Sequence, residues 1–316
     1  MRCLVTGVAG FVGSTLAERL VALGHDVLGV DCFTDYYPRS NKEANLVALR
    51  AGPRFGFEEL DLATADLAPL VKGTDAIFHQ AAQAGVRASW GTMFETYTSC
   101  NVLATQRLLE ATKQAGTVER FVYASSSSVY GDTTDLPMRE TSRPRPFSPY
   151  GVTKLAAEHL CELYRENFGV PTVSLRYFTV YGPRQRPDMG FHRFIARLLR
   201  GEPLPVYGDG EQTRDFTFVG DIVEANLQSL NEGAKGVYNI GGGSRVTLND
   251  VLATLGELTG RPLALDRQGK QPGDVRHTAA DTSRAQAELS YQPKVSLREG
   301  LARQVEWMKA NPEAWG

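Results

Sequence analysis

Tyr150 and Lys154 are the two residues whose types and spacing point most directly to chemistry. They lie four positions apart in a segment with helical patterning, so both side chains project from one face of a helix. A nearby positive charge lowers the pKa of a phenol, and such a phenol can take a proton from an alcohol. A Tyr-x-x-x-Lys spacing is also common on helix surfaces, so the pair alone does not establish a catalytic site.

A serine-rich segment precedes this helix. Residues 124–131 read Ala-Ser-Ser-Ser-Ser-Val-Tyr-Gly, and Ser126 follows a predicted strand over residues 120–124. Ligands of open α/β sheets bind at the carboxyl ends of the strands. The sequence therefore places a hydroxyl group at the sheet edge where the Tyr150 phenol would act.

Gly7, Gly10 and Gly13 lie between the first predicted strand and the first predicted helix. Backbone amides at a helix N-terminus attract phosphate oxygens, and glycine has no Cβ to keep a pyrophosphate away. The G-x-x-G-x-x-G spacing differs from the common G-x-G-x-x-G. However, Asp31 ends the second strand, where a carboxylate accepts hydrogen bonds from an adenosine ribose and repels a 2′-phosphate. This pattern predicts NAD rather than NADP; Asp61 is a candidate for the adenine edge, although an exposed loop carboxylate explains it nearly as well.

The elements that must position these residues alternate along the first half of the chain. Apolar, β-rich runs at residues 3–6, 26–30, 55–60, 76–79, 120–124 and 172–176 predict parallel strands that are buried on both faces. Helices are predicted over residues 12–23 and 92–115, and a third has Ser148 as N-cap and Pro149 at its first position, followed by residues 150–168. The pattern predicts an α/β fold with a Rossmann-like, doubly wound parallel sheet.

Beyond Arg176 the pattern becomes irregular, with short helices predicted over residues 191–200 and 220–230 between loops. We interpret residues 1–176 as the dinucleotide-binding Rossmann domain and residues 177–316 mainly as a smaller C-terminal substrate-binding lobe. A strand near residues 237–240 and a closing helix over 297–309 are expected to pack back on the first domain.

Composition excludes several classes of protein. The 316 residues include 34 Lys and Arg against 36 Asp and Glu, and 42% are hydrophobic, which excludes a disordered chain. The absence of basic blocks argues against binding to nucleic acid. Cys3, Cys32, Cys100 and Cys161 are widely separated, so we expect neither a disulfide nor a bound metal. No apolar run approaches the ~20 residues that span a bilayer, and no leader pattern opens the sequence, so we expect no membrane association and a soluble, cytoplasmic protein.

Taken together, these motifs resemble the extended short-chain dehydrogenase/reductase family and, within it, the nucleotide-sugar 4-epimerases. The resemblance covers nearly the whole chain and rests on Gly7, Gly10, Gly13, Asp31, residues 79–82, Ser126, Tyr150, Lys154, residues 176–178 and residues 214–216. It implies that Tyr150 is the catalytic base, that Lys154 holds the nicotinamide ribose and lowers the pKa of Tyr150, and that Ser126 binds the reacting sugar hydroxyl. The NAD-binding residues that it implies are Gly7, Gly10, Phe11, Val12, Gly13, Asp31, Asp61, Leu62, Ala81, Tyr150, Lys154 and Tyr177.

The residues after Ser126 help to choose among the reactions of this family. Nucleotide-sugar 4,6-dehydratases carry an Asp-Glu pair there and UDP-glucuronate decarboxylases a Glu, whereas this chain has Ser127 and Ser128. Elimination needs a carboxylate as its proton carrier, but oxidation and re-reduction at C4 need only Tyr150 and the cofactor. The resemblance therefore implies 4-epimerisation of a UDP-sugar through a transient 4-keto intermediate.

Different segments of the chain resemble enzymes that act on different sugars. Residues 31–37 and 83–87 are similar to UDP-glucuronate 4-epimerases, and the hydroxyls of Ser127, Ser128 and Thr179 could bind a uronate carboxylate. Residues 207–210 and 273–277 are more similar to UDP-glucose 4-epimerases and decarboxylases. We expect conversion of UDP-glucuronate to UDP-galacturonate, with UDP-glucose 4-epimerase as the first alternative and UDP-glucuronate decarboxylase as the second. A non-catalytic NAD-binding sensor is the alternative outside the enzymes.

Four arginines are candidates for binding the substrate. Arg87, Arg214 and Arg276 are predicted to bind its diphosphate, because a planar guanidinium matches phosphate geometry and stays charged. Arg186 could reach the sugar, although a loop arginine facing water explains it nearly as well. The helices predicted over residues 92–115 and 150–168 also resemble a pair that forms a four-helix dimer interface in this family, so we expect a homodimer.

Overall fold

The computed structural model of the chain describes residues 1–269 and 273–315. Seven strands form one parallel sheet. Across the sheet they are β11 (Gly236–Ile240), β6 (Thr172–Tyr177), β5 (Arg120–Ser126), β4 (Ala76–His79), β1 (Arg2–Thr6), β2 (Asp26–Asp31) and β3 (Phe55–Glu59). The chain reverses its direction of winding between β1 and β4, which confirms the predicted doubly wound sheet.

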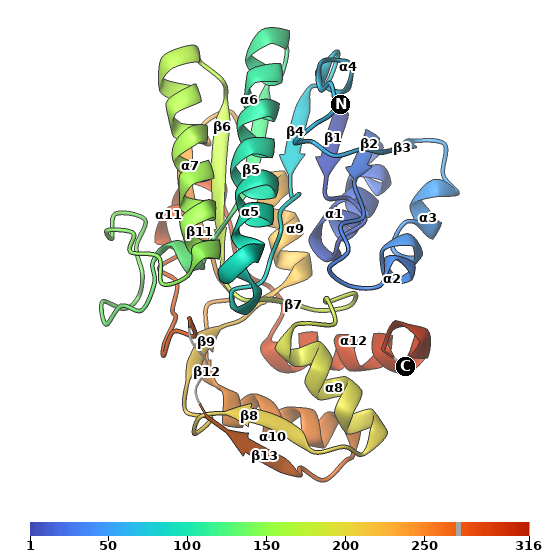
Figure 1. Cartoon of the computed structure of the whole chain (residues 1–316), viewed down its shortest axis with the longest axis vertical. Coiled ribbons are helices and arrows are strands. Elements are labelled where there is room, and N and C mark those ends of the chain that lie inside the picture. Colours follow the sequence, from blue (N-terminus) through green and yellow to red (C-terminus); the bar gives the residue numbers. More distant parts are fainter. Residues whose placement is uncertain (270–272, 316) are drawn as a thin grey trace.

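Helices cover both faces of the sheet, which explains why its strands are continuously apolar. On one face lie α1 (Phe11–Ala22), α3 (Val47–Arg50), α9 (Val219–Gln228) and α11 (Ser283–Leu289). On the other lie α4 (Ala68–Val71), α6 (Ala104–Ala115) and α7 (Pro149–Phe168), and Figure 1 shows α6 and α7 side by side. The strands predicted for the first half are all present, with ends that agree to within two residues.

The start of α7 is held by local contacts that the sequence predicts. The hydroxyl of Ser148 caps the helix by accepting a hydrogen bond from the Gly151 amide at 3.1 Å, and Pro149 is its first residue. Gly151 packs so closely on the turn η4 (Ser127–Val129) that a Cβ would lie 2.5 Å from the Ser128 carbonyl oxygen. The helix that carries Tyr150 therefore begins directly against the serine-rich segment.

The continuous helix predicted over residues 92–115 is wrong. The structure divides this segment into η2 (Gly91–Met93), α5 (Phe94–Thr98), a π-helical turn η3 (Ser99–Leu103) and α6. The π turn buries Asn101, whose side chain accepts from the Gln83 amide at 2.7 Å and donates to the Thr153 hydroxyl at 3.0 Å. This side chain ties the segment after β4 to α7.

The C-terminal segments do not all follow the expected assignment. As expected, β11 pairs with β6 in the large sheet, and α9 and α11 also pack in this layer. The expectation that the closing helix packs on the first domain is wrong. Helix α12 (Leu297–Ala310) packs against α8 (Gly190–Arg200) and α10 (Leu248–Thr259) because its apolar side chains complete the core of the smaller lobe.

The smaller lobe lies beyond the carboxyl edge of the sheet (Figure 1). Besides α8, α10 and α12, it contains three two-stranded sheets. These pair β7 (Val180–Tyr181) with β10 (Thr217–Phe218), β9 (Thr213–Asp215) with β12 (Arg245–Thr247), and β8 (Leu204–Tyr207) with β13 (Leu265–Gln268). Within the described part of the chain, no helix has the length and apolar character needed to cross a bilayer.

Candidate active site

A cavity of about 860 Å³ lies between the carboxyl edge of the sheet and the smaller lobe. Its volume falls in the range of small-molecule and cofactor sites. The structure brings most of the predicted site residues into its lining, namely Gly7, Gly10, Phe11, Val12, Gly13, Asp31, Asp61, Leu62, Ala81, Arg87, Ser126, Ser127, Ser128, Tyr150, Lys154, Tyr177, Thr179 and Arg186. Residues far apart in the sequence therefore share one concave surface.

The glycine-rich loop at the start of α1 fits a dinucleotide. A Cβ on Gly7 would lie 2.7 Å from the backbone of Ala81, and one on Gly13 would clash with the carbonyl of Gly7, so both glycines allow the loop to close tightly. Gly10 lines the cavity as the residue that precedes α1, where helix amides face outward. A phosphate can therefore approach the backbone here without meeting a side chain.

Asp31, the last residue of β2, both shapes this loop and faces the cavity. Its Oδ2 accepts a hydrogen bond from the Ala9 amide at 3.1 Å, and its Oδ1 accepts one from the Phe33 amide at 2.9 Å. Burial raises the pKa of Asp31, while the Phe33 amide and the charge of Lys42 act in the opposite direction. A carboxylate that retains free lone pairs in a ligand cavity can accept hydrogen bonds from ribose hydroxyls.

Ser126, Tyr150 and Lys154 line one wall of the cavity, from the end of β5 and the first turns of α7. The Ser126 Oγ accepts a hydrogen bond from the Ser128 amide at 3.1 Å, which fixes the hydroxyl. The ring of Tyr150 packs edge-on against Tyr97, with 6.2 Å between ring centroids. The arrangement supplies a fixed phenol and a fixed hydroxyl that can act on the same alcohol.

The pKa of the Tyr150 phenol depends on burial and on two neighbouring groups. Burial raises the pKa of Tyr150, and the Ser126 hydroxyl and the charge of Arg186 act to lower it. The resemblance implies that Lys154 also lowers the pKa of this phenol. Burial lowers the pKa of Lys154 itself from 10.5 to about 7, and its Nζ lies over the ring of Tyr123, 4.7 Å from the centroid. Arg186, which sequence reasoning placed at the sugar, is therefore also a charge that acts to lower the pKa of this phenol.

Arg87 and Arg186 both line the cavity. Arg87 forms an ion pair with Asp274 at 2.6 Å, and its guanidinium lies 4.4 Å from the centroid of the Tyr207 ring. Arg186 binds both carboxylate oxygens of Asp188, at 2.9 and 3.0 Å. Because Arg87 precedes α5 while Asp274 and Tyr207 belong to the smaller lobe, this contact joins the two lobes.

Arg214 and Arg276 do not line the cavity in this structure. The Arg214 guanidinium donates to the carbonyl oxygens of Thr213, Val275 and Arg276, so it connects two chain segments of the smaller lobe. Arg276 binds both carboxylate oxygens of Asp209, each at 2.9 Å. That Arg214 and Arg276 bind the substrate diphosphate stays a prediction.

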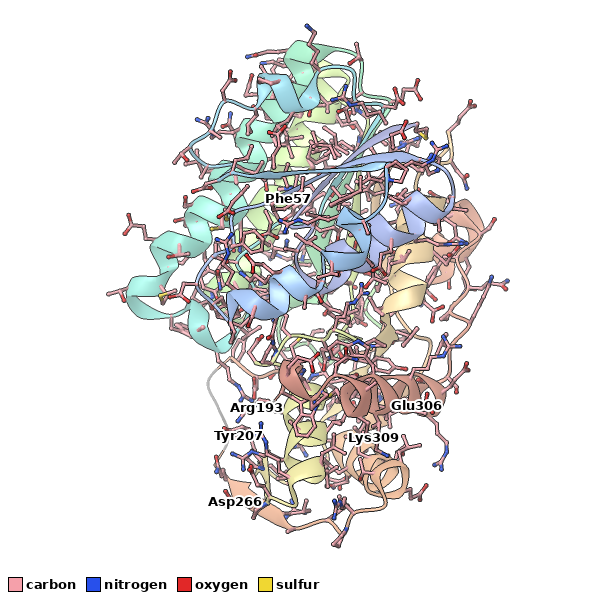
Figure 2. The ribbon with its side chains drawn as sticks, turned by 90° about the vertical axis from the view of Figure 1, so that its right-hand side faces the viewer. Phe57, Arg193, Tyr207, Asp266, Glu306 and Lys309 are labelled. Atoms are coloured by element: carbon pink, nitrogen blue, oxygen red, sulfur yellow. The ribbon has the colours of Figure 1, made fainter. Side chains whose placement is uncertain are left out.

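Sequence reasoning missed several residues of the cavity, including Tyr36, Lys42, Arg193 and Tyr207. Figure 2 labels Arg193 and Tyr207 in the smaller lobe. Tyr36 could have been noticed, because its segment, residues 31–37, was already linked to the substrate class. No spacing pattern identified Lys42 or Arg193, because each lies in an ordinary charged helix segment.

Comparison with known proteins agrees with this geometry. The model of the NAD dependent epimerase/dehydratase family matches residues 3–241, more than half of the chain. The chain belongs to this family. NAD is accordingly its cofactor, and the glycine-rich loop, Asp31 and the wall formed by Tyr150 and Lys154 are the parts of the cavity that suit it.

Three relatives are similar to this chain over nearly its whole length. The UDP-glucuronic acid 4-epimerase of Bacillus cereus, solved with UDP-glucuronic acid and NAD, has a TM-score of 0.95 and 42% identity, covering 98% of this chain and 99% of the other. The UDP-glucuronate 4-epimerase of Thermodesulfobacterium geofontis is 37% identical, covering 98% of this chain and 97% of its own. The uncharacterized UDP-glucose epimerase YtcB of Bacillus subtilis is 45% identical, with 98% of both chains covered.

Proposed function

We propose that this protein is a UDP-glucuronate 4-epimerase that forms UDP-galacturonate and restores its NAD in each turnover. The observation that carries the proposal is the shared cavity wall of Ser126, Tyr150 and Lys154, with the hydroxyls of Ser127 and Thr179 in the same lining. The Bacillus cereus and Thermodesulfobacterium geofontis relatives, named as UDP-glucuronate 4-epimerases, support this choice.

The residues of the chain perform the proton transfer. When bound, NAD accepts the hydride from C4 of the sugar and returns it to the opposite face. Tyr150 takes the proton of the C4 hydroxyl and later gives it back, while Ser126 holds that oxygen. Lys154 is only 3% exposed, and the low polarity around it strengthens its electrostatic contacts.

The neutral hydroxyls near Ser126 suit a uronate substrate. A 4-keto uronate is a β-keto acid that loses carbon dioxide when its carboxylate bond aligns with the carbonyl. Ser127, Ser128 and Thr179 line the cavity and can donate hydrogen bonds to the carboxylate. These contacts would hold it out of the geometry for decarboxylation, and the two residues directly after Ser126 are serines rather than the carboxylates found there in dehydratases and decarboxylases.

The name of the Bacillus subtilis relative supports UDP-glucose 4-epimerase as the second candidate, with the same three catalytic residues. The two candidates differ in whether the site binds the carboxylate of a uronate sugar, which UDP-glucose lacks. Comparison of kcat/KM for UDP-glucuronate and UDP-glucose distinguishes them, because specificity is the ratio of these values.

The deciding experiment is to incubate the purified chain with UDP-glucuronate, without added NAD, and to identify the product by NMR. UDP-galacturonate is expected. UDP-xylose or a 4-keto pentose would show a decarboxylase. Absence of any product, together with no absorbance change at 340 nm when NAD and UDP-sugar are supplied, would show a non-catalytic NAD-binding protein.

A homodimer is also part of the proposal. Large apolar side chains are exposed on the outer surface of the α5–α6–α7 layer, namely Phe94, Leu103, Val152, Leu163 and Phe168. Such a surface is typical of a protein interface. Light scattering should give twice the chain mass of 34.6 kDa, and Leu163→Glu should reduce it toward that mass. A monomeric wild-type protein would contradict the proposal.

The same proposal places the protein in the cytoplasm. All four cysteines are free thiols, and Cys32 is exposed, as suits a reducing compartment. Fractionation of the cells that produce it should recover the activity with the soluble cytoplasmic enzymes, and recovery with the membrane or the culture medium would contradict this placement.

A further inference from the structure

Asp188, in the loop between β7 and α8, is a carboxylate of the cavity to which the epimerisation mechanism gives no part. It pairs with Arg186, whose Nε donates to Oδ1 at 2.9 Å and whose terminal nitrogen donates to Oδ2 at 3.0 Å. The Arg186 side chain is 21% exposed and that of Asp188 31%. Within residues 1–269 and 273–315, Asp188 is the only side chain that pairs with this guanidinium. The cavity therefore presents a neutral pair here rather than a free cation.

A chain of contacts connects this pair to the proposed catalytic base. The Tyr36 hydroxyl donates to the Asp188 Oδ2 at 3.3 Å, and a Cβ on Gly85 would lie 2.2 Å from that hydroxyl. The carbonyl oxygen of Gly85 accepts a hydrogen bond from the Tyr97 hydroxyl at 2.6 Å. The Tyr97 ring in turn packs against the ring of Tyr150. The pair thus belongs to the end of the cavity where the sugar would react.

The guanidinium of Arg186 keeps its charge in this position. Burial acts to lower the pKa of Arg186, but the charge of Asp188 and the hydrogen bonds to it raise that pKa. An arginine has five N–H donors, and the pair with Asp188 uses two of them. A substrate carboxylate that enters this end of the cavity therefore meets a positive charge and a negative charge together.

We propose that Asp188 is a specificity-determining residue, which cancels the charge of Arg186 so that this cation does not select UDP-glucuronate over UDP-glucose. The inference rests on the proposed function, because it assumes that a UDP-sugar binds with its C4 hydroxyl at Tyr150. The two sugars differ only at C6, where one has a carboxylate and the other a neutral hydroxymethyl group. With Asp188 in place, recognition of the carboxylate falls to the neutral serine and threonine hydroxyls of the cavity.

The test compares the dissociation constants of UDP-glucuronate and UDP-glucose by titration calorimetry. All proteins are full-length, loaded with NAD and carry Tyr150→Phe, so that neither ligand is converted during the titration. Asp188→Asn keeps the shape of the side chain and one oxygen acceptor. It should raise the preference for UDP-glucuronate about tenfold or more, the size of one hydrogen bond to a charged group. The gain should shrink in about 1 M NaCl, because salt screens partly exposed charges.

Removal of the cation should have the opposite effect. Arg186→Met leaves the carboxylate of Asp188 without its partner, so it should shift the preference toward UDP-glucose. The double variant lacks both charges and should return to within about threefold of the parent, which is the coupling expected of a pair. These two variants also decide the question if Asp188→Asn does not fold, because neither contains an unpaired arginine. A double variant with the same preference as Arg186→Met would overturn the proposal.

Asp274→Asn is the matched control. Asp274 lines the same cavity and pairs with Arg87 at 2.6 Å, but Arg87 is predicted to bind the diphosphate, which both ligands share. The preference of this variant should stay within about twofold of the parent. An unchanged preference in Asp188→Asn, an equal gain in Asp274→Asn, or failure of both ligands to bind would overturn the proposal. A wild-type chain that binds both ligands but forms no product would contradict only the proposed function.

Discussion

Glu158 and Arg176 form a buried ion pair near the cavity wall of Ser126, Tyr150 and Lys154, with 2.5 Å between the Glu158 Oε1 and a terminal nitrogen of Arg176. Both side chains are only 4% exposed. The other oxygen of Glu158 accepts from the hydroxyl of Ser125, the neighbour of Ser126, and Arg176 donates to the hydroxyl of Tyr130 at 2.7 Å. The pair therefore joins α7 to β5 and β6 next to Ser126.

Removal of one member of this pair should destabilise the protein strongly. Glu158→Gln leaves the Arg176 charge buried without its partner, at a cost of about 3–5 kcal/mol in the free energy of unfolding. Denaturation in urea measures this value. The matched control is Glu257→Gln, which breaks a pair of similar length, 2.6 Å to Arg298, that is 62% exposed on each side and should cost less than about 1 kcal/mol. Equal losses in the two variants would show that burial does not strengthen the pair.

Replacement of Tyr150 by phenylalanine should lower kcat by about 10²–10⁴-fold, the range for a positioned acid or base. Binding of NAD should persist, because the glycine-rich loop and Asp31 are unchanged. Tyr97→Phe is the control, since this tyrosine packs against Tyr150 but its own hydroxyl donates to the carbonyl oxygens of Ala84 and Gly85. A Tyr150→Phe enzyme with wild-type turnover would eliminate the proposed base.

Ser127→Ala and Thr179→Ala should change the products rather than only the rate. Each variant removes a hydroxyl that can restrain the uronate carboxylate, so more of the 4-keto intermediate should lose carbon dioxide. The fraction of UDP-pentose among the products should rise, and chromatography of the reaction mixture measures it. If that fraction stays at the wild-type value in both variants, the hydroxyls do not protect the carboxylate.

Lys154 should make the stability of the protein depend on pH. Burial lowers the pKa of Lys154 in the folded chain from 10.5 to about 7. Between these values the unfolded chain binds more protons at this position, so the free energy of unfolding rises with pH. In Lys154→Met the rise between about pH 7 and pH 9 should be smaller than in the wild type. Lys309→Met, at an exposed position on α12 labelled in Figure 2, should leave the slope unchanged. Identical slopes for wild type and Lys154→Met would contradict the shifted pKa.

The sequence predicted the parts of the site that depend on local chain geometry. Gly7, Gly10 and Gly13 must follow a strand and open a helix, and Ser148 with Pro149 marks the start of α7 to the residue. Because the carboxyl ends of parallel strands meet at one edge, the motifs after β1, β2 and β5 had to share one cavity once the sheet was predicted.

Residue type and spacing did not predict which partners the charged groups of long side chains contact. Arg214 and Arg276 match family motifs, but in this structure they bind carbonyl groups and Asp209 within the smaller lobe. The inward turn of Asn101 and the packing of α12 on the smaller lobe likewise depend on partners distant in the sequence. Local patterns cannot encode such contacts.

The sequence by itself therefore determined the doubly wound sheet, the cofactor loop and the Tyr150–Lys154 pair, because each follows from residue periodicity or from a fixed offset along one element. Only the tertiary structure decided which charges face the cavity, as Lys42 and Arg193 do. The reason is that a lysine or arginine reaches several ångströms from its backbone and finds its partner only after the two lobes have packed.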